Sequence, residues 1–341
     1  MTAEMAYGAL SAKVRALYGK RLRSDDFARL AARRSEAEIL DELRQHPGWS
    51  RALALVPPGA WGYVGRVEVE RALQEELRLE YQSLAYYVPR EDKPLMQFQL
   101  RAAERSAILS ALRRLKAGLS PREAPPPPRI ALHSRLDEAA AAACTTYDQL
   151  TEAARDTIYY SALRQLRPPR TDELPDFTRA DAVLRTAYYA HLLRIVRSQY
   201  QGRTQKVLLR AIGEQIDLLN ILHILRLKTY FPQTPREDYA GVLFPFQYRL
   251  TMDFLRRLCE APGAEGAYEL LRESPYGDCF DETAVDAVEE YYQRAVFRLP
   301  GAQGAGAGGA GQRDRVGEVR RALSRGICQS GGRLAPVFHR I

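Results

Sequence analysis

The residues best suited to chemistry form one polar stripe in an otherwise apolar segment. Glu214, Asp217, Asn220 and His223 follow one another at steps of three residues, which places them along one slowly turning face of a helix. Carboxylates and an imidazole in this spacing could ligate a metal ion inside a helical bundle. Such a site usually takes Glu-x-x-His pairs from two helices, and the chain has neither a second pair nor an HExxH motif. The stripe therefore favours hydrogen bonding between helices, or the lining of a polar cavity, over metal binding.

Patterns for catalysis and nucleotide binding are absent or accidental. The five histidines are scattered, and neither a Gly-x-Ser-x-Gly nor a P-loop pattern occurs. Gly304, Gly306 and Gly309 formally match GxGxxG, but no strand precedes them and no apolar helix follows. The sequence therefore predicts no catalytic residue, no metal site and no cofactor.

An acidic doublet near the N-terminus is also better explained by helix structure than by chemistry. Asp25 and Asp26 lack the third acidic residue with which an all-α terpene-cyclase-like enzyme would hold magnesium-bound diphosphate. Short polar side chains at this kind of position accept hydrogen bonds from the first free amides of a helix. We expect Ser24 or Asp25 to cap a helix there.

Composition narrows the class of protein. The 341 residues are 46% hydrophobic and 27% charged, which fits a folded chain and excludes a disordered or collagen-like one. The four cysteines are far apart and form no CxxC pair, so they favour a reducing, cytosolic location over a disulfide framework. No apolar run approaches the roughly 20 residues of a membrane helix, and the first ten residues do not resemble a signal peptide. We expect a chain that neither spans a membrane nor is exported by that route.

The charge balance points to an acidic partner. The net charge is +8, with 50 basic against 42 acidic residues, so nucleic acid, anionic lipid and an acidic protein all remain open as partners. The basic residues are mixed with acidic ones along helical segments, which favours solvated helix faces as their explanation. One such segment carries Arg101, Glu104, Arg105, Arg113, Arg114 and Lys116.

Hydrophobic periodicity predicts an all-α fold. Apolar residues recur at helical spacing over residues 68–87 and 183–196, and they are dense enough over 207–227 to predict a largely buried helix. The alternation typical of strands is missing. Prolines at 57–58, 125–128, 168–169, 232, 235 and 275 mark the connectors. Four tyrosine doublets, at 86–87, 159–160, 188–189 and 291–292, favour core or interface packing over base stacking.

A repeat search suggests three pseudo-equivalent helical units. Asp26, Asp148 and Asp253 are each followed at offsets of five and six by a pair of small or apolar residues, and a proline comes 20 to 22 residues after each. A long helix is expected to begin near Glu68, Asp181 and Asp286, and Arg-Leu-Lys ends the units at 114–116 and 226–228. The predicted units span about 5–118, 130–231 and 246–298.

The third unit is incomplete by this pattern. From residue 299 the chain becomes rich in glycine and then in arginine, and each glycine disfavours a helix by about 1 kcal/mol relative to alanine. Our hypothesis is that the reading frame was lost near residue 299; the alternative is a native disordered tail over 299–341. Translation of the gene in the other two frames tests it, since one of them must contain an amphipathic helix that ends in a basic cluster.

Several stretches resemble one known family. They are residues 7–17, the block Asp25–Ala31 leading to Leu40 and Leu43, the helix end from Glu80 to Pro89, and Asp217–Asn220 leading to Arg226–Lys228. Together they are similar to the C subunit of the A/V-type ATPase or ATP synthase, whose eukaryotic counterpart is the d subunit. The resemblance covers roughly residues 5–298.

The resemblance implies a fold and a role. The fold would be an all-α, funnel-like protein of three units, and the chain would be a non-catalytic socket of a rotor. It would sit on the cytoplasmic face of the membrane ring of proteolipid subunits and hold the D and F axle subunits for proton or sodium transport, with surface contact to the membrane and no nucleic-acid or small-molecule ligand. Arg114 with Lys116, and Arg226 with Lys228, are the expected contacts, with complementation of the helix C-terminal dipole as the alternative. Glu214, Asp217 and Asn220 would line the interior. The alternative is a basic all-α scaffold that binds nucleic acid or another acidic partner.

Overall fold

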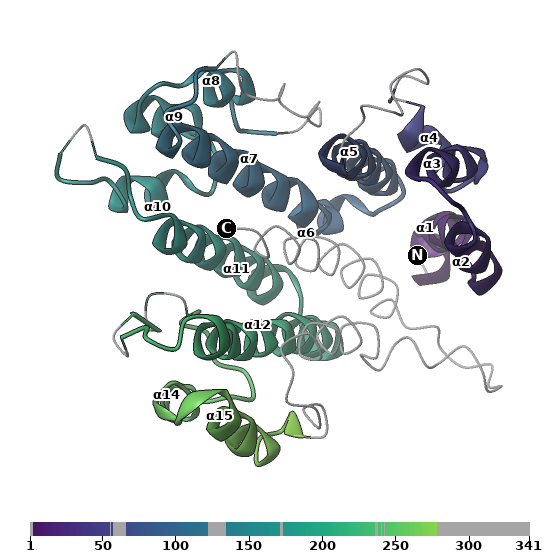
Figure 1. Cartoon of the computed structure of the whole chain (residues 1–341). Coiled ribbons are helices and arrows are strands. Elements are labelled where there is room, and N and C mark those ends of the chain that lie inside the picture. Colours follow the sequence, from purple (N-terminus) through teal and green to yellow (C-terminus); the bar gives the residue numbers. More distant parts are fainter. Residues whose placement is uncertain are drawn as a thin grey trace. The chain divides into compact units, whose positions relative to one another are not determined.

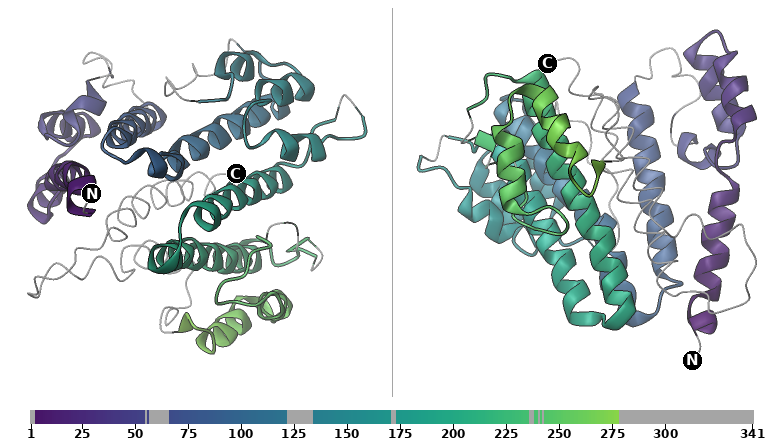
Figure 2. Two further views of the ribbon diagram at one scale, coloured as in Figure 1. Left: turned by 180° about the vertical axis from the view of Figure 1, so that it is seen from behind. Right: turned by 90° about the horizontal axis from the view of Figure 1, so that it is seen from below.

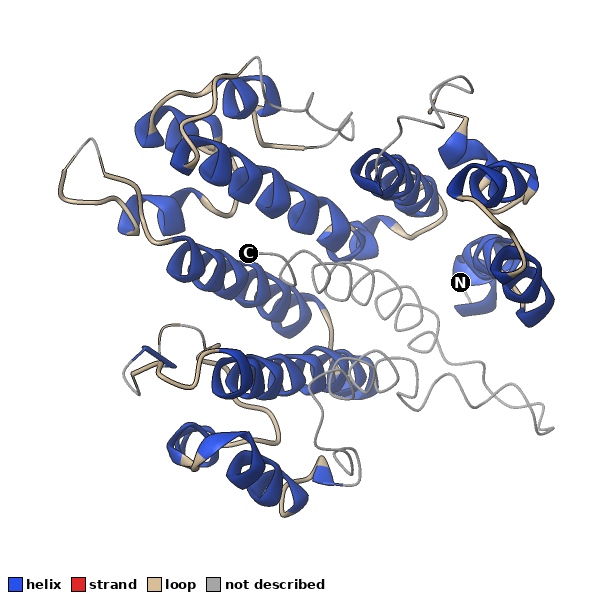
Figure 3. Ribbon diagram, viewed as in Figure 1, coloured by secondary structure: helices blue, strands red, loops and turns tan. Residues whose placement is uncertain are grey.

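Segments with helical periodicity, separated by prolines, fold as helices throughout the described part of the chain. The computed structural model describes residues 3–54, 56, 66–121, 134–170, 173–235, 238–239, 241 and 243–277. Within these ranges every regular element is a helix and no strand occurs (Figure 3). The all-α prediction is confirmed. The division into three units stays a prediction, and the segments 278–298 and 299–341 lie outside the described residues.

The described residues divide into two compact units, one within Met1–Leu100 and Pro126–Ser134, the other within Arg101–Pro125 and Arg135–Ile341. Figure 1 labels their helices. The first unit holds α1 (Ala3–Gly19), α2 (Ser24–Ala31), α3 (Glu36–Gln45), α4 (Ser50–Leu53), α5 (Arg66–Ala85), the short 3-10 helix η2 (Arg90–Asp92) and α6 (Lys93–Met96). The helix expected over 68–87 is therefore α5, which ends before the exposed Tyr86 and Tyr87.

One apolar cluster of the first unit joins its short helices to α5. Leu40 and Leu43 of α3 pack with Leu53 of α4, and Trp49 and Val69 lie against them. A polar contact connects α1 to the corner after α5, where the buried Tyr7 hydroxyl donates a hydrogen bond to Asp92. Apolar and polar contacts thus act together in this unit.

The start of α2 differs from the expected cap. Ser24 already belongs to the helix, and neither Ser24 nor Asp25 caps it. The Asp26 carboxylate, in the first turn, instead accepts a hydrogen bond from the backbone N–H of Arg23 at 2.7 Å. The prediction of a Ser24 or Asp25 cap was wrong by one position, because the third residue of the helix can reach back to the amide before it.

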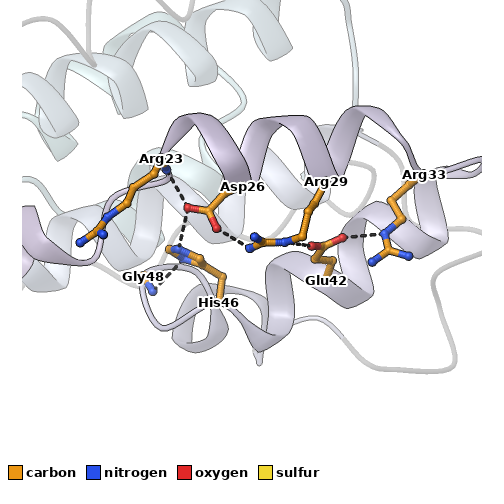
Figure 4. A network of polar contacts seen from close by, with 7 residues as sticks. All are labelled: Arg23, Asp26, Arg29, Arg33, Glu42, His46 and Gly48. Atoms are coloured by element: carbon orange, nitrogen blue, oxygen red, sulfur yellow. Dashed lines mark hydrogen bonds and ion pairs between the residues drawn. The ribbon is translucent and has the colours of Figure 1, made fainter.

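Exposed ion pairs connect α2, and the loop that follows it, to α3 (Figure 4). Glu42 accepts hydrogen bonds from Arg29 Nε at 2.9 Å and from Arg33 Nε at 2.6 Å. Arg33 and Arg29 together hold the pKa of the Glu42 carboxyl below its ordinary value. Since the arginine side chains are solvated, these ion pairs contribute little to stability and mainly align the two helices.

The second unit is built on long helices. It comprises the part of α7 (Phe98–Lys116) from Arg101 onward, α8 (Glu138–Ala143), α9 (Tyr147–Ala153), α10 (Tyr160–Gln165), α11 (Phe177–Gln199), α12 (Gly202–Tyr230), α14 (Met252–Glu260) and α15 (Gly263–Arg272). Figures 1 and 2 show α7, α11 and α12 side by side, with α14 and α15 on the far side of α12. Prolines 168–169, 232, 235 and 275 fall between or after helices, as predicted.

Helix α12 confirms the expected buried segment over 207–227. Its central apolar residues are nearly inaccessible, with Ile212, Ile221 and Leu225 at 0% exposure. The tyrosine doublets differ in burial. Tyr159, Tyr188 and Tyr189 are core residues, as predicted, whereas Tyr86 is 75% exposed. The doublet at 291–292 lies outside the described residues.

The expectation of solvated basic faces was wrong for most of the segment on α7. Arg113 and Lys116 are exposed, but the remaining members are buried: Arg101, Glu104, Arg105 and Arg114. The reason is that α7 is contacted on several faces at once. Cys144 follows α8 and accepts from Arg114, while the Tyr159 hydroxyl donates to the carbonyl of Arg101 at 2.6 Å.

Candidate functional site

Asp217 of α12 is the centre of the polar stripe. Its carboxylate is fully buried, and one oxygen, Oδ2, accepts three hydrogen bonds: from the N–H of Arg249 at 2.8 Å, from the N–H of Leu250 at 3.1 Å, and from the hydroxyl of Tyr276 at 2.9 Å. Burial raises the pKa of Asp217, and the backbone and Tyr276 hydrogen bonds oppose that shift. The side chain thus fastens two later segments of the chain to α12.

Asn220 holds the same segment one turn further along. Its Oδ1 accepts from the N–H of Phe244 at 2.8 Å, and its Nδ2 donates to the carbonyl of Phe244 at 3.4 Å. The Phe244 ring is buried, with its centroid 5.4 Å from that of Tyr189 and 5.6 Å from that of His223. The amide therefore replaces the hydrogen-bond partners that a buried loop backbone lacks.

Glu214 completes the stripe at its N-terminal side. It is 5% exposed, accepts from Arg210 Nε at 2.7 Å, and lies 3.7 Å from Arg249 Nη2. Hydrogen bonding to a neighbouring element, which the spacing favoured, is confirmed for Asp217 and Asn220. Glu214 instead bonds within α12, to Arg210, and reaches the neighbouring loop through its 3.7 Å ion pair with Arg249. In the described part of the chain, no group of three or more His, Cys, Asp or Glu side chains could hold a metal ion.

Close approach of the loop explains a glycine in the middle of α12. A Cβ atom on Gly213 would lie 2.3 Å from Cγ and 2.7 Å from Cβ of Tyr248, so the base of that ring rests directly on the helix backbone. Neither Gly213 nor Tyr248 stood out in the sequence, although an isolated glycine in a helical pattern is a signal of close packing.

Gly213→Ala gives a test of this packing. Alanine would favour an isolated helix by about 1 kcal/mol, but here we expect a net loss of about 1–3 kcal/mol of stability because Tyr248 must move. Chemical denaturation followed by circular dichroism measures it. Gly8→Ala in α1, where a Cβ atom meets nothing within 4 Å, is the matched control and is expected to be neutral or stabilising.

At each of the two basic helix ends, one charged side chain donates to backbone carbonyls within the chain: Arg114 on α7 and Lys228 on α12. Arg114 Nη2 donates to the carbonyl of Cys144 at 2.6 Å and lies 3.2 Å from its Sγ atom. Cys144 follows the last residue of α8, so the guanidinium neutralises the negative end of that helix. Burial raises the pKa of the Cys144 thiol, against the effect of Arg114.

Lys228 makes the corresponding contact at the end of α12. Its Nζ donates to the carbonyls of Cys259 at 2.8 Å and Ala261 at 2.6 Å, at the C-terminal end of α14. The ring of Tyr239 lies 5.5 Å from Nζ, within the range of a cation–π interaction. Lys228 therefore caps a helix that comes later in the chain.

The structure separates the predicted contact residues into two groups. Glu214, Asp217 and Asn220 lie together on α12 with internal partners, and Arg114 and Lys228 are buried at two different helix ends. Lys116 is exposed and Arg226 is half-buried. Contact of these residues with partner subunits stays a prediction.

No helix in the described ranges has the length and apolar character needed to cross a membrane.

Comparison with known proteins identifies the family. A model of the family described as ATP synthase (C/AC39) subunit matches residues 10–299. The chain is also similar to the C subunit of the A-type ATP synthase of Methanosphaera stadtmanae, with 27% identity over 306 residues that cover 84% of this chain and 75% of the relative. The resemblance stated from the sequence is therefore confirmed. With its all-helical fold, the chain belongs to the ATP synthase (C/AC39) subunit family as a non-catalytic subunit of an A/V-type ATP synthase complex.

Proposed function

We propose that this subunit is a socket of the central rotor. It would connect the D and F axle subunits to the ring of proteolipid subunits, on the cytoplasmic face of the membrane, so that torque passes between ATP hydrolysis and ion movement. The observation that carries the proposal is the family match over residues 10–299. The polar anchors on α12 support it, because a part that transmits torque must resist internal displacement.

The alternative, a basic scaffold for nucleic acid, is disfavoured by the mixing of charges at the surface. The exposed Arg33 is paired with Glu42. The exposed Arg256 is likewise paired with Asp253. Binding to nucleic acid depends on basic side chains that reach phosphates, and these arginines already have carboxylate partners. The charge distribution therefore favours a protein partner.

Among the predicted contact residues, we propose that Lys116 and Arg226 face partner subunits. Lys116 is exposed and Arg226 is half-buried, whereas Glu214, Asp217 and Asn220 act through the segments they contact. Exposed charges at an interface guide association and fix orientation more than they add affinity.

The experiment is co-purification from native membranes after gentle extraction, with a tag on the N-terminus. We expect the axle and proteolipid subunits to be recovered, and a Lys116→Glu, Arg226→Glu double variant to recover less of them. Lys93→Glu, at another exposed lysine, is the control and is expected to behave as the unchanged chain. Purification of the unchanged chain without those subunits would contradict the proposed role.

We also propose that the reading frame changes near residue 299. The family match ends at that residue, and the Gly-rich run begins directly after it. The same co-purification, repeated with a chain that continues in the frame encoding an amphipathic helix, is expected to give higher recovery. Absence of such a helix from both other frames would leave a native tail as the explanation.

A further inference from the structure

Two arginines on α7, one helical turn apart, are equally buried but differently paired. Arg101 is 6% exposed and its Nη1 donates to Glu104 Oε1 at 2.6 Å. Arg105 is 8% exposed, yet within the described part of the chain no carboxylate pairs with it, and its enclosed Nε has no hydrogen-bond partner. The guanidinium group of Arg105 lies over the ring of Tyr188, with 5.8 Å between its Cζ atom and the ring centroid.

Charged neighbours of Arg105 lie on α11. There, Asp181 Oδ2 accepts from Arg185 Nε at 2.8 Å, while Oδ1 of the same carboxylate has no partner among the described residues. Burial and then the charge of Arg105 lower the pKa of Arg185. Burial raises the pKa of Asp181, but Arg185 and Arg105 together outweigh it and hold that pKa below its ordinary value. Two guanidinium groups therefore share one carboxylate, and one positive charge is left over.

A buried cation without a counterion is expensive. Removing an ion from water is strongly unfavourable, and only a close opposite charge with good hydrogen bonds offsets this loss of hydration. Buried polar groups in folded proteins are nearly always paired, so this excess positive charge requires an anion from outside the described residues. The cluster of Arg105, Arg185 and Asp181 is accessible to solvent from the side of α11. There the side chain of Arg185 is 14% exposed and that of Asp181 is 23% exposed.

We propose that Arg105 and Arg185 accept an acidic side chain from a helix of a partner subunit that packs against α7 and α11. A single carboxylate matches the single unbalanced charge, whereas a phosphate group would bring more negative charge than the cluster lacks. The two long helices lie side by side (Figures 1 and 2), and a pair of adjacent helices forms a groove into which the side chains of another helix can pack. This inference rests on the proposed function, in which the axle subunits are the partners.

The first test uses the opposite pairing of the two arginines. Methionine has a similar length and no charge. We expect Arg105→Met to leave the melting temperature of the full chain unchanged or to raise it, because the variant removes an uncompensated charge. Arg101→Met, the matched control, is expected to lower it because the buried Glu104 carboxylate loses its charged donor and keeps the backbone N–H of Arg135. A fall in melting temperature with Arg105→Met as large as that with Arg101→Met would show that Arg105 serves the fold and would overturn the inference.

The second test measures binding of the purified axle subunits to the full chain. Arg105→Met is expected to weaken binding by at least about tenfold and to reduce its dependence on salt. Arg194→Gln, at an exposed arginine of α11, is expected to bind as the unchanged chain. Replacing each acidic residue of the axle with glutamine, alone and with Arg105→Met, should identify one carboxylate whose loss has no further effect in the Arg105→Met chain.

The outcomes separate the two proposals. If the unchanged chain does not bind the axle subunits, the proposed function fails. If the unchanged chain binds and Arg105→Met binds equally well, the proposed function stands and the carboxylate acceptor is wrong.

Discussion

Replacing Asp217 with alanine is expected to lower the free energy of unfolding by about 3–5 kcal/mol, since each buried donor left without an acceptor costs about 1–3 kcal/mol. Three donors lose their acceptor at once: the N–H groups of Arg249 and Leu250 and the hydroxyl of Tyr276. Loss of the buried charge itself offsets part of this, because burial already disfavours ionised Asp217. Urea denaturation followed by circular dichroism measures the difference.

Tyr276→Phe is the graded control for this prediction. It removes one of the three donors and leaves the carboxylate bonded to two backbone amides, so we expect a loss of about 1 kcal/mol. Asp217→Asn retains an acceptor oxygen and should fall between the two variants. Equal stabilities for Asp217→Ala and Tyr276→Phe would mean that the loop amides find other partners, and that Asp217 does not fasten the loop.

The polar stripe on α12 shows what the sequence can and cannot predict. Steps of three residues placed Glu214, Asp217 and Asn220 on one face, and the preference for hydrogen bonding to other elements was correct for Asp217 and Asn220. The partners of these two side chains could not be identified, because Phe244 lies 24 residues from Asn220 and Tyr276 lies 59 residues from Asp217. Local periodicity contains no information about which distant loop folds back.

The sequence pattern did not predict that charged residues of α7 are buried, for a related reason. A mixed charge pattern along a helix normally indicates a solvated face, and this held for Arg113 and Lys116. It failed for Arg101 and Arg114, whose buried partners, Glu104 and the Cys144 carbonyl, satisfy them internally. The fold class needed only periodicity and prolines, whereas the candidate site needed the tertiary contacts.

Lys228→Met is expected to destabilise the unit by about 2–4 kcal/mol, because two buried carbonyls lose a charged donor. The ammonium also neutralises the C-terminal end of α14, an effect worth up to about 2 kcal/mol in partly buried sites. Methionine keeps the length of the side chain, so the change isolates the charge and the hydrogen bonds. Thermal unfolding measures the total loss of stability. Relative to the unchanged chain, hydrogen exchange in the variant should become faster in peptides from α14 and α15 and stay the same in peptides from α9.

The Lys228 variant also decides how the basic end of α12 acts. Arg226→Met, two residues away and half-buried, is the control and should leave the exchange of α14 unchanged in the isolated chain. If Lys228 is an internal cap, its loss is visible without any other subunit, and any defect in assembly follows from the loosened helix pair. If Lys228→Met leaves the isolated chain intact and only assembly suffers, Lys228 is a contact residue, and the hydrogen bonds to Cys259 and Ala261 must break when the partner binds.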